Sequence, residues 1–342
     1  SVIDKPNFKH FYSHRCKSDS EVVPDETSEW LSETGKISKS WPSFEIRDSQ
    51  VDLASDTYNT FKEDSILLAE AGTGLGKSLA YLSAGILDSK KRDIPLVVST
   101  YTKSLQEQLF IKDIPQLAKS LDIRMDAVIY KGRQNYICLS RLENLIANCK
   151  NLLSNRDCIE FLSIVVWSKY TSTGDIGECH GFKTSYALRV WDLLKSELGY
   201  CTSSRCIAFD GCYISGVRKS LRRANIIIVN HSLLCSELLQ EKSNLPEEFN
   251  YVIDEGHNLV SVAREQLISK ISSHSFDDIF SFFSLNNKVY KKQIKELISN
   301  VPESESYLFN LESSSKSIKS DIKSFFESYN QNKRSELARS KY

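Results

Sequence analysis

The chain has 342 residues, enough for two or three domains at ~100–200 residues each. Its composition, 41% apolar and 26% charged, is that of an ordinary globular protein. The 44 basic and 44 acidic residues cancel, so any affinity for nucleic acid has to come from local patches. No run reaches the ~18–20 apolar residues of a membrane span, and residues 1–10 contain no apolar secretion signal. We therefore expect a cytoplasmic protein with no membrane partner.

Apolar runs alternate with helical patterns after a polar stretch at residues 1–40, which we interpret as a tail or linker. The strand-like runs are Ser65–Ala69, Pro95–Ser99, Ala127–Tyr130, Asn225–Val229 and Tyr251–Asp254. Helical patterns at Lys77–Leu87 and Lys103–Phe110 follow the first two runs. Strands that alternate with helices predict an α/β fold with a parallel sheet.

Two segments break this alternation. Between Tyr136 and Tyr213 there are few strand signals and seven of the nine cysteines, which indicates an insertion between two strands of the sheet. Residues 261–342 are rich in Ser, Lys, Glu and Phe at helical spacing, which predicts a separate helical region. With no secretion signal, the cysteines favour metal or cluster binding over disulfides.

A glycine-rich loop joins the first expected strand to the first expected helix. Its residues are Ala71, Gly72, Thr73, Gly74, Leu75, Gly76, Lys77 and Ser78. The strict phosphate-loop pattern has Gly where Ala71 stands, but the three glycines still allow backbone N–H groups to turn onto phosphate oxygens. Lys77 would then reach the β- and γ-phosphates of ATP, and Ser78 would bind Mg²⁺. The alternative is a plain glycine turn with a solvent-facing lysine.

The run Asp254, Glu255, Gly256 and His257 ends the last expected strand. An Asp in this place can hold Mg²⁺, and the adjacent Glu can polarise an attacking water. The alternative is a simple helix start, because acidic residues favour first turns.

Together these elements resemble the DinG/XPD-type iron–sulfur helicases of superfamily 2, in the DinG branch. The glycine loop is similar to helicase motif I and DEGH to the DEAH box, while Arg47 and Gln50 resemble the R-x-x-Q element that reads adenine. Residues 99–109 resemble motif Ia, which touches the DNA backbone, and residues 131–138 resemble the segment before the first cluster ligand. Residues 229–234 resemble the N-H-x-L-L stretch.

The resemblance implies a domain plan and a set of roles. Residues 41–135 and 213–260 would form a RecA-like, ATP-binding lobe, residues 136–212 an inserted 4Fe-4S domain, and residues 261–342 the start of a helical arch. Lys77, Asp254, Glu255 and His257 would be catalytic. Movement on DNA would run 5′ to 3′. The motifs of the second lobe, with its arginine finger, are not found, so we expect a fragment or a split subunit that is completed in cis or in trans.

Four cysteines are candidate cluster ligands. Cys201, Cys206 and Cys212 are spaced C-x4-C-x5-C, with Cys138 far upstream. By residue type alone these thiols suit either tetrahedral zinc or an iron–sulfur cluster. The resemblance implies that they hold a [4Fe–4S] cluster. The remaining five are interpreted as small apolar residues: Cys16, Cys149, Cys158, Cys179 and Cys235.

Basic and aromatic residues follow the insertion. Arg218, Lys219, Arg222 and Arg223 lie close together, and Tyr200, Phe209 and Tyr213 alternate with the cysteines. Single-stranded or forked DNA would be bound by such basic side chains and aromatic platforms. The alternative is a solvated helix face.

Two functions remain open from the sequence. The first is an ATP-dependent DNA helicase, of which this chain is the first motor lobe. The second is a non-catalytic module that binds ATP and DNA, or that senses redox state through its cluster. Glu255 favours the enzyme, because a protein that only binds nucleotide has no need of a group that activates water.

Overall fold

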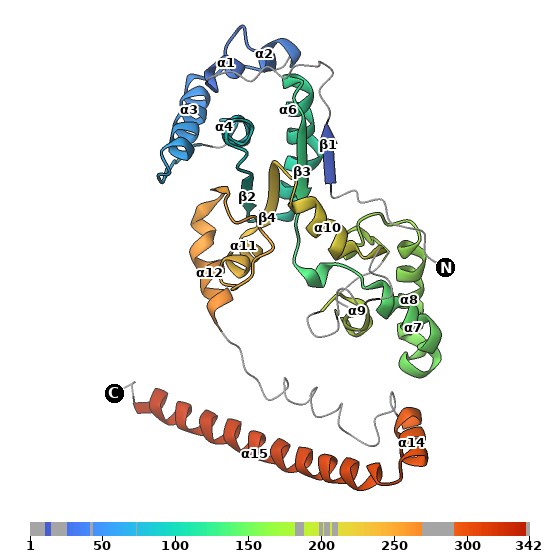
Figure 1. Cartoon of the computed structure of the whole chain (residues 1–342). Helices are drawn as coiled ribbons and strands as arrows, with labels where there is room; N and C mark the ends of the chain where they lie inside the picture. Colours follow the sequence, from blue (N-terminus) through green and yellow to red (C-terminus); the bar gives the residue numbers. More distant parts are fainter. Residues whose placement is uncertain are drawn as a thin grey trace. The chain divides into compact units, whose positions relative to one another are not determined.

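The computed structural model describes residues 11–14, 26–41, 44–72, 74–181, 188–197, 201, 206, 211–268 and 291–339. The chain forms two compact units. One contains Ser1–Leu145 and Ile159–Leu267, and the other contains Ile146–Cys158 and Ile268–Tyr342. The first unit contains the sheet (Figure 1).

A five-stranded sheet runs in the order β1-β3-β4-β2-β5. Its strands are β1 (Phe11–His14), β2 (Leu96–Thr100), β3 (Met125–Ile129), β4 (Ile226–Asn230) and β5 (Asn250–Ile253). Strands β2 to β5 are parallel, and β1 pairs antiparallel with β3 at one edge. Four of the five predicted strands and the α/β class with a mostly parallel sheet are therefore confirmed. Every residue of β2 and β3 is buried, as a parallel sheet covered on both faces requires.

Helices surround this sheet in the first unit. They are α3 (Asp48–Lys62), α4 (Lys77–Arg92), α5 (Lys103–Gln108), the π-helical turn η1 (Leu109–Asp113), α6 (Ile114–Leu121), α10 (Tyr213–Leu221), α11 (His231–Leu238), the turn η6 (Gly256–Asn258) and α12 (Leu259–Leu267). Gly85 allows α4 to lie against the sheet, because a Cβ there would stand 2.3 Å from the Leu96 side chain.

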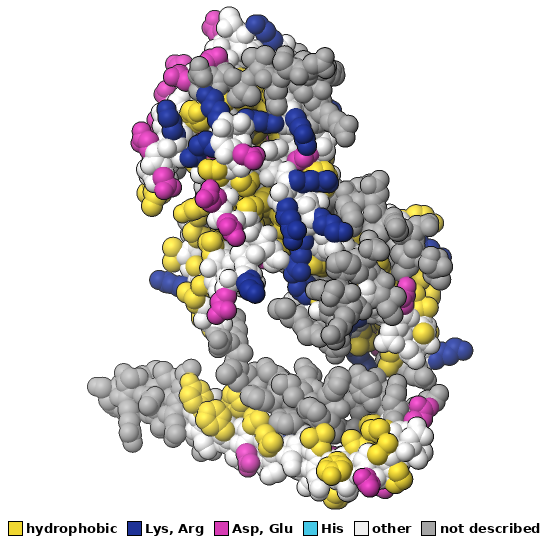
Figure 2. All heavy atoms as spheres, in the orientation of Figure 1, with side chains coloured by type: hydrophobic (Ala, Val, Ile, Leu, Met, Phe, Trp, Pro, Cys, Tyr) yellow, Lys and Arg dark blue, Asp and Glu magenta, His cyan; other side chains and the backbone are white. Residues whose placement is uncertain are grey.

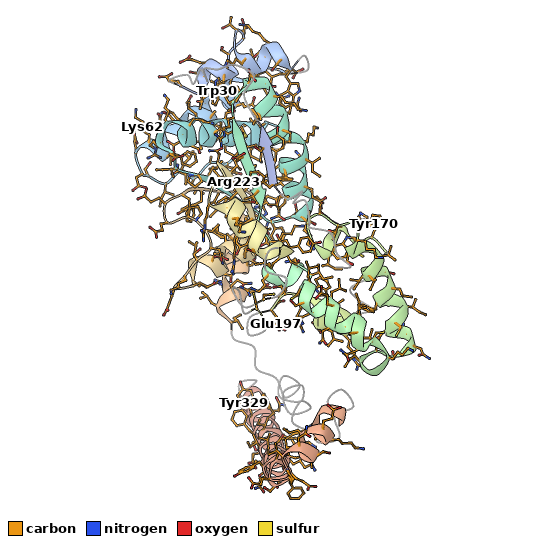
Figure 3. All side chains as sticks on the ribbon, turned by 45° about the vertical axis from the view of Figure 1, so that its right-hand side comes forward. Trp30, Lys62, Tyr170, Glu197, Arg223 and Tyr329 are labelled. Atoms are coloured by element: carbon orange, nitrogen blue, oxygen red, sulfur yellow. The ribbon has the colours of Figure 1, made fainter. Side chains whose placement is uncertain are left out.

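The polar N-terminal stretch is not the tail that we expected, at least in its described part. It contributes strand β1 and two short helices, α1 (Ser28–Leu31) and α2 (Lys36–Ser40), which lie beside α3 and α6 (Figure 1). Trp30 and Leu31 join the main hydrophobic core and are 2% and 0% exposed (Figure 3). A few large apolar side chains in a polar segment were enough to anchor it.

The predicted strand at Ser65–Ala69 is wrong. This segment is irregular and exposed, with Ile66 at 93% and Leu68 at 98%. An apolar run becomes a strand only where a neighbour offers backbone hydrogen bonds, and β5, the last strand of the sheet, pairs with β2 alone among the described residues.

The predicted insertion is mostly helical. It contains the turn η2 (Arg133–Asn135) and the elements α7 (Leu139–Leu152), α8 (Asn155–Ser168), η3 (Ile176–Glu178) and α9 (Leu188–Leu194). Where it is described, its only β pairings are the single bridges Tyr136–Asp175 and Ile137–Lys195. The domain boundaries given above stay predictions.

The second unit is helical where it is described. It includes α14 (Lys291–Asn300) and the long α15 (Ser304–Arg339). No helix in the described part of the chain has the length and apolar character needed to cross a membrane.

Leu31→Ala and Leu68→Ala make the same chemical change at opposite exposures. Leu31 is fully buried, so its truncation should lower the free energy of unfolding by about 2–5 kcal/mol. Leu68→Ala should stay within about 0.5 kcal/mol of wild type, because the side chain is already in water. Urea titration followed by circular dichroism measures both. A large loss in Leu68→Ala would show that residues 65–69 pack in solution.

Candidate functional site

The glycine loop is placed by its own backbone. Gly74 and Gly76 have φ angles of +82° and +84°, which favour glycine, and Gly76 precedes the first residue of α4. The Lys77 ammonium spans the loop and donates to the carbonyl of Ala71 at 2.9 Å. A Cβ on Gly72 would meet nothing within 4 Å, so the loop is open there. Thr73 lies outside the described residues.

Arg47 and Gln50, the expected adenine readers, both bind the glycine loop. The Arg47 guanidinium donates to the carbonyl of Gly74, and Gln50 Nε2 donates to the carbonyl of Gly76 at 2.9 Å. A Cβ on Gly76 would come 2.0 Å from Gln50 Nε2, so glycine is required here for space as well as for its φ angle. The two residues at the start of α3 therefore hold the loop in place.

The acidic turn follows β5 and is close to the start of α4. Asp254 Oδ1 accepts from the N–H of Glu255 at 2.9 Å, and its Oδ2 accepts from the Tyr81 hydroxyl at 3.1 Å. Glu255 is exposed and has a φ angle of +56°. His257 is exposed and contacts the Asn258 amide at 3.0 Å.

Tyr81 links the two predicted halves of the site, although no sequence pattern pointed to it. It lies on α4 three residues after Ser78, and its hydroxyl donates to Asp254 at 3.1 Å. Burial raises its pKa well above the usual value, and the charge of Asp254 adds to this effect. The tyrosine therefore stays a neutral donor that joins α4 to the acidic turn.

A buried histidine supports the acidic turn from the sheet. His231 is 1% exposed, and its Nδ1 shares a 2.7 Å hydrogen bond with the Ser99 hydroxyl. The Ser99 carbonyl accepts from the N–H of Asp254 at 2.9 Å. Burial lowers the pKa of His231, although the carbonyls of Asp254 and Glu255 near the ring oppose this. The ring is therefore held in its neutral form.

A pocket of about 300 Å³ opens beside the start of α4. Arg47 and Gln50 line one part of it, and Trp41 and Phe44 provide an aromatic pair with ring centroids 6.3 Å apart. Small-molecule pockets usually range from ~300 to 1,000 Å³ and combine apolar walls with a few polar groups. This pocket has the size and lining suited to a nucleoside.

The four candidate cysteines are half-buried free thiols. Burial raises the pKa of Cys138, and Cys206 and Cys212 raise it further by their charge. Burial also raises the pKa of Cys212, with Cys201 and Cys206 adding to it. Among the described residues, no group of three or more His, Cys, Asp or Glu side chains has the arrangement of a bound metal ion. The cluster therefore stays a prediction.

The basic residues of α10 and its end are mostly on the surface. Lys219, Arg222 and Arg223 are exposed, and the Arg223 guanidinium lies 4.2 Å from the centre of the Phe11 ring (Figure 3). Lys and Arg side chains form a band on the face of this unit shown in Figure 2. Tyr213, expected as a stacking platform, is instead 1% exposed and packs on Gly174. Tyr200 and Phe209 lie outside the described residues.

Comparison with known proteins identifies the family. Residues 100–276, just over half of the chain, match the DEAD_2 family model. The chain belongs to the DEAD_2 family of DinG-type helicases. It is 30% identical over 271 residues to the ATP-dependent DNA helicase YoaA of Escherichia coli, covering 77% of this chain and 40% of YoaA.

Two further relatives carry the name DinG. The ATP-dependent helicase DinG of Mycobacterium tuberculosis is 31% identical over 244 residues, which cover 65% of this chain and 36% of that protein. The 3′-5′ exonuclease DinG of Bacillus subtilis is 31% identical over 232 residues, which cover 68% of this chain and 24% of that protein. The DinG-type chain described here thus spans about 40% or less of the length of these relatives.

Ser99→Ala should destabilise the first unit by about 1–3 kcal/mol, because it leaves a buried nitrogen of His231 without its partner. Ser83→Ala is the matched control, since the Ser83 hydroxyl is equally buried and makes no hydrogen bond in the structure. We expect less than about 0.5 kcal/mol there. Urea denaturation of both variants provides the comparison, and equal effects would contradict a structural role for the Ser99–His231 pair.

Proposed function

We propose that this chain is the ATP-binding first motor lobe of a DNA helicase. The observation that carries the proposal is that Tyr81, which lies on α4 three residues after Ser78, donates to Asp254 at 3.1 Å and so links the two segments of the site. Ser78 and Asp254 are the two side chains that phosphate-loop enzymes use to hold Mg²⁺. The names of YoaA and the mycobacterial DinG support ATP as the nucleotide and DNA as the substrate.

Each residue then has a definite task in hydrolysis. The loop's N–H groups and Lys77 would bind the β- and γ-phosphates. Ser78 and Asp254 would hold Mg²⁺, which would supply positive charge beside these phosphates. Glu255 orients the attacking water and accepts its proton. Its exposed side chain and its position beside Asp254 fit this task. His257 lies on the same turn, where it can support Glu255.

A non-catalytic ATP- and DNA-binding module is the second candidate, and Glu255 again separates the two. Single-stranded DNA would lie along exposed Lys219, Arg222 and Arg223, by contacts to its phosphates. Movement from 5′ to 3′, and a second lobe supplied in cis or in trans, complete the proposal. Phosphate release that depends on Glu255 and is stimulated by DNA would identify the enzyme.

By the resemblance to the DinG/XPD-type helicases, Cys138, Cys201, Cys206 and Cys212 would bind an iron–sulfur cluster. Such clusters are held by cysteine thiolates, and the four thiols are free and half-buried. Cys138 lies directly before α7, and Cys212 lies directly before α10. A [4Fe–4S] cluster would join both ends of the insertion.

Lys77→Ala should weaken ATP binding at least ~10-fold, because one buried charge-assisted contact to phosphate contributes about 1.5–3 kcal/mol. Asp254→Ala should remove the Mg²⁺ dependence of binding. Isothermal titration calorimetry of the 342-residue chain, with and without Mg²⁺, measures both. Lys62→Ala and Asp52→Ala remove exposed charges on α3 and should behave as wild type. Wild-type affinity in Lys77→Ala would refute the assignment of the loop.

Replacing any of Cys138, Cys201, Cys206 or Cys212 by Ser should remove most of the iron and sulfide from protein purified without oxygen. Replacing Cys149, Cys158 or Cys179 should leave them unchanged. Elemental analysis and the visible absorption spectrum give the readout. The cluster is rejected if the protein contains zinc without iron, or if Cys206→Ser retains its iron.

A further inference from the structure

The pocket beside the glycine loop has a polar wall that no recognised motif explains. Its lining includes Arg47 and Gln50 from the start of α3, and Ser78 and Leu79 from the start of α4. Gln108 and Asp113, from the end of α5 and from η1, line it as well. Residues 105–109 belong to the segment that resembles motif Ia, so the position of Gln108 beside the nucleotide loop was not expected.

The local sequence explains why Asp113 faces this pocket. Pro115 is the second residue of α6 and has no N–H to offer the carbonyl four residues earlier. The chain accommodates this with the π-helical turn η1, which ends at Asp113. Such turns shift the following side chains around the helix axis and are frequent at functional sites.

Asp113 lies inside a continuous helical run, because η1 leads directly into α6 and the backbone of Asp113 is itself helical. Its Oδ2 accepts from Gln108 Nε2 at 3.2 Å. Burial raises the pKa of Asp113, with Gln108 and Lys112 opposing the shift, so the carboxylate would gain from further hydrogen-bond donors.

The chemistry of ATP limits what such a carboxylate can bind. It repels the phosphates and can only accept. Because Ser78 and Asp254 are the proposed holders of Mg²⁺, the ribose hydroxyls and the adenine amino group are left as its partners on ATP. Arg47 and Gln50, on another wall, resemble the residues that read adenine. We propose that Asp113, positioned by Gln108, accepts a hydrogen bond from a ribose hydroxyl of bound ATP and so selects ribonucleotides. This inference rests on the proposed nucleotide site.

The test compares ATP with 2′-deoxy-ATP and 3′-deoxy-ATP on the 342-residue chain by isothermal titration calorimetry, which needs no label on the ribose. Wild type should bind ATP ~10-fold more tightly than at least one deoxynucleotide. Asp113→Ala should lower the affinity for ATP to the affinity that wild type has for that deoxynucleotide. The affinity of Asp113→Ala for the deoxynucleotide itself should stay within about twofold of the wild-type value. Asp113→Asn, which keeps one acceptor, should lie between. Asp93→Asn, at the end of α4, is the control and should keep full discrimination.

Three results would overturn the inference. The first is equal affinity of the wild-type chain for all three nucleotides. The second is an Asp113→Ala variant that keeps the wild-type discrimination between them. The third is an Asp113→Ala variant whose affinity for all three nucleotides falls equally, which would show a structural role for Asp113. A wild-type chain that binds none of them refutes the proposed ATP site itself, so the two failures are distinguishable.

Discussion

Two hydrogen bonds of Ser99 join the carboxyl ends of β2, β4 and β5. The first is the buried bond between the Ser99 hydroxyl and the His231 imidazole. The second runs from the N–H of Asp254 to the Ser99 carbonyl, so Ser99 connects the histidine to the acidic turn. The bond is short and enclosed, and a buried polar group without its partner is costly. The position of Asp254 therefore follows from the sheet rather than from the loop that carries it.

The glycine loop is fixed from the opposite side, by α3. Arg47 and Gln50 hold the carbonyls of Gly74 and Gly76, so the protein's own side chains support the bent form of the loop. A preformed loop spends less binding energy on ordering its backbone. Movement of Arg47 or Gln50 would therefore shift the backbone of the loop directly.

Sequence patterns predicted those parts whose physics is local. β2 to β5 are apolar runs bounded by turn residues, and the glycine loop has a fixed order of residue types, so both were found. Residues 65–69 look like a strand in composition, but a strand needs a neighbour, and sequence does not show one. The burial of Trp30 was not predicted, because a single apolar residue in a polar segment forms no periodic apolar pattern. Tyr81 and Asp113 reach the site only through the packing of α4 and the π turn before Pro115, which patterns of residue type do not encode.

The insertion presents a mechanical problem that its cysteines would solve. β3 and β4 are neighbours in the sheet although the whole insertion separates them in the chain. Its entry is held by the buried pair of Lys131 and Asp175 and by the bond from Cys138 N–H to the carbonyl of Leu194. Cys138 lies at that entry, and Cys212 lies at the exit, where α10 begins. A cluster bound by both cysteines would hold the entry and the exit of the insertion at a fixed distance from each other. A displacement of the inserted helices would then move β3 and α10 together.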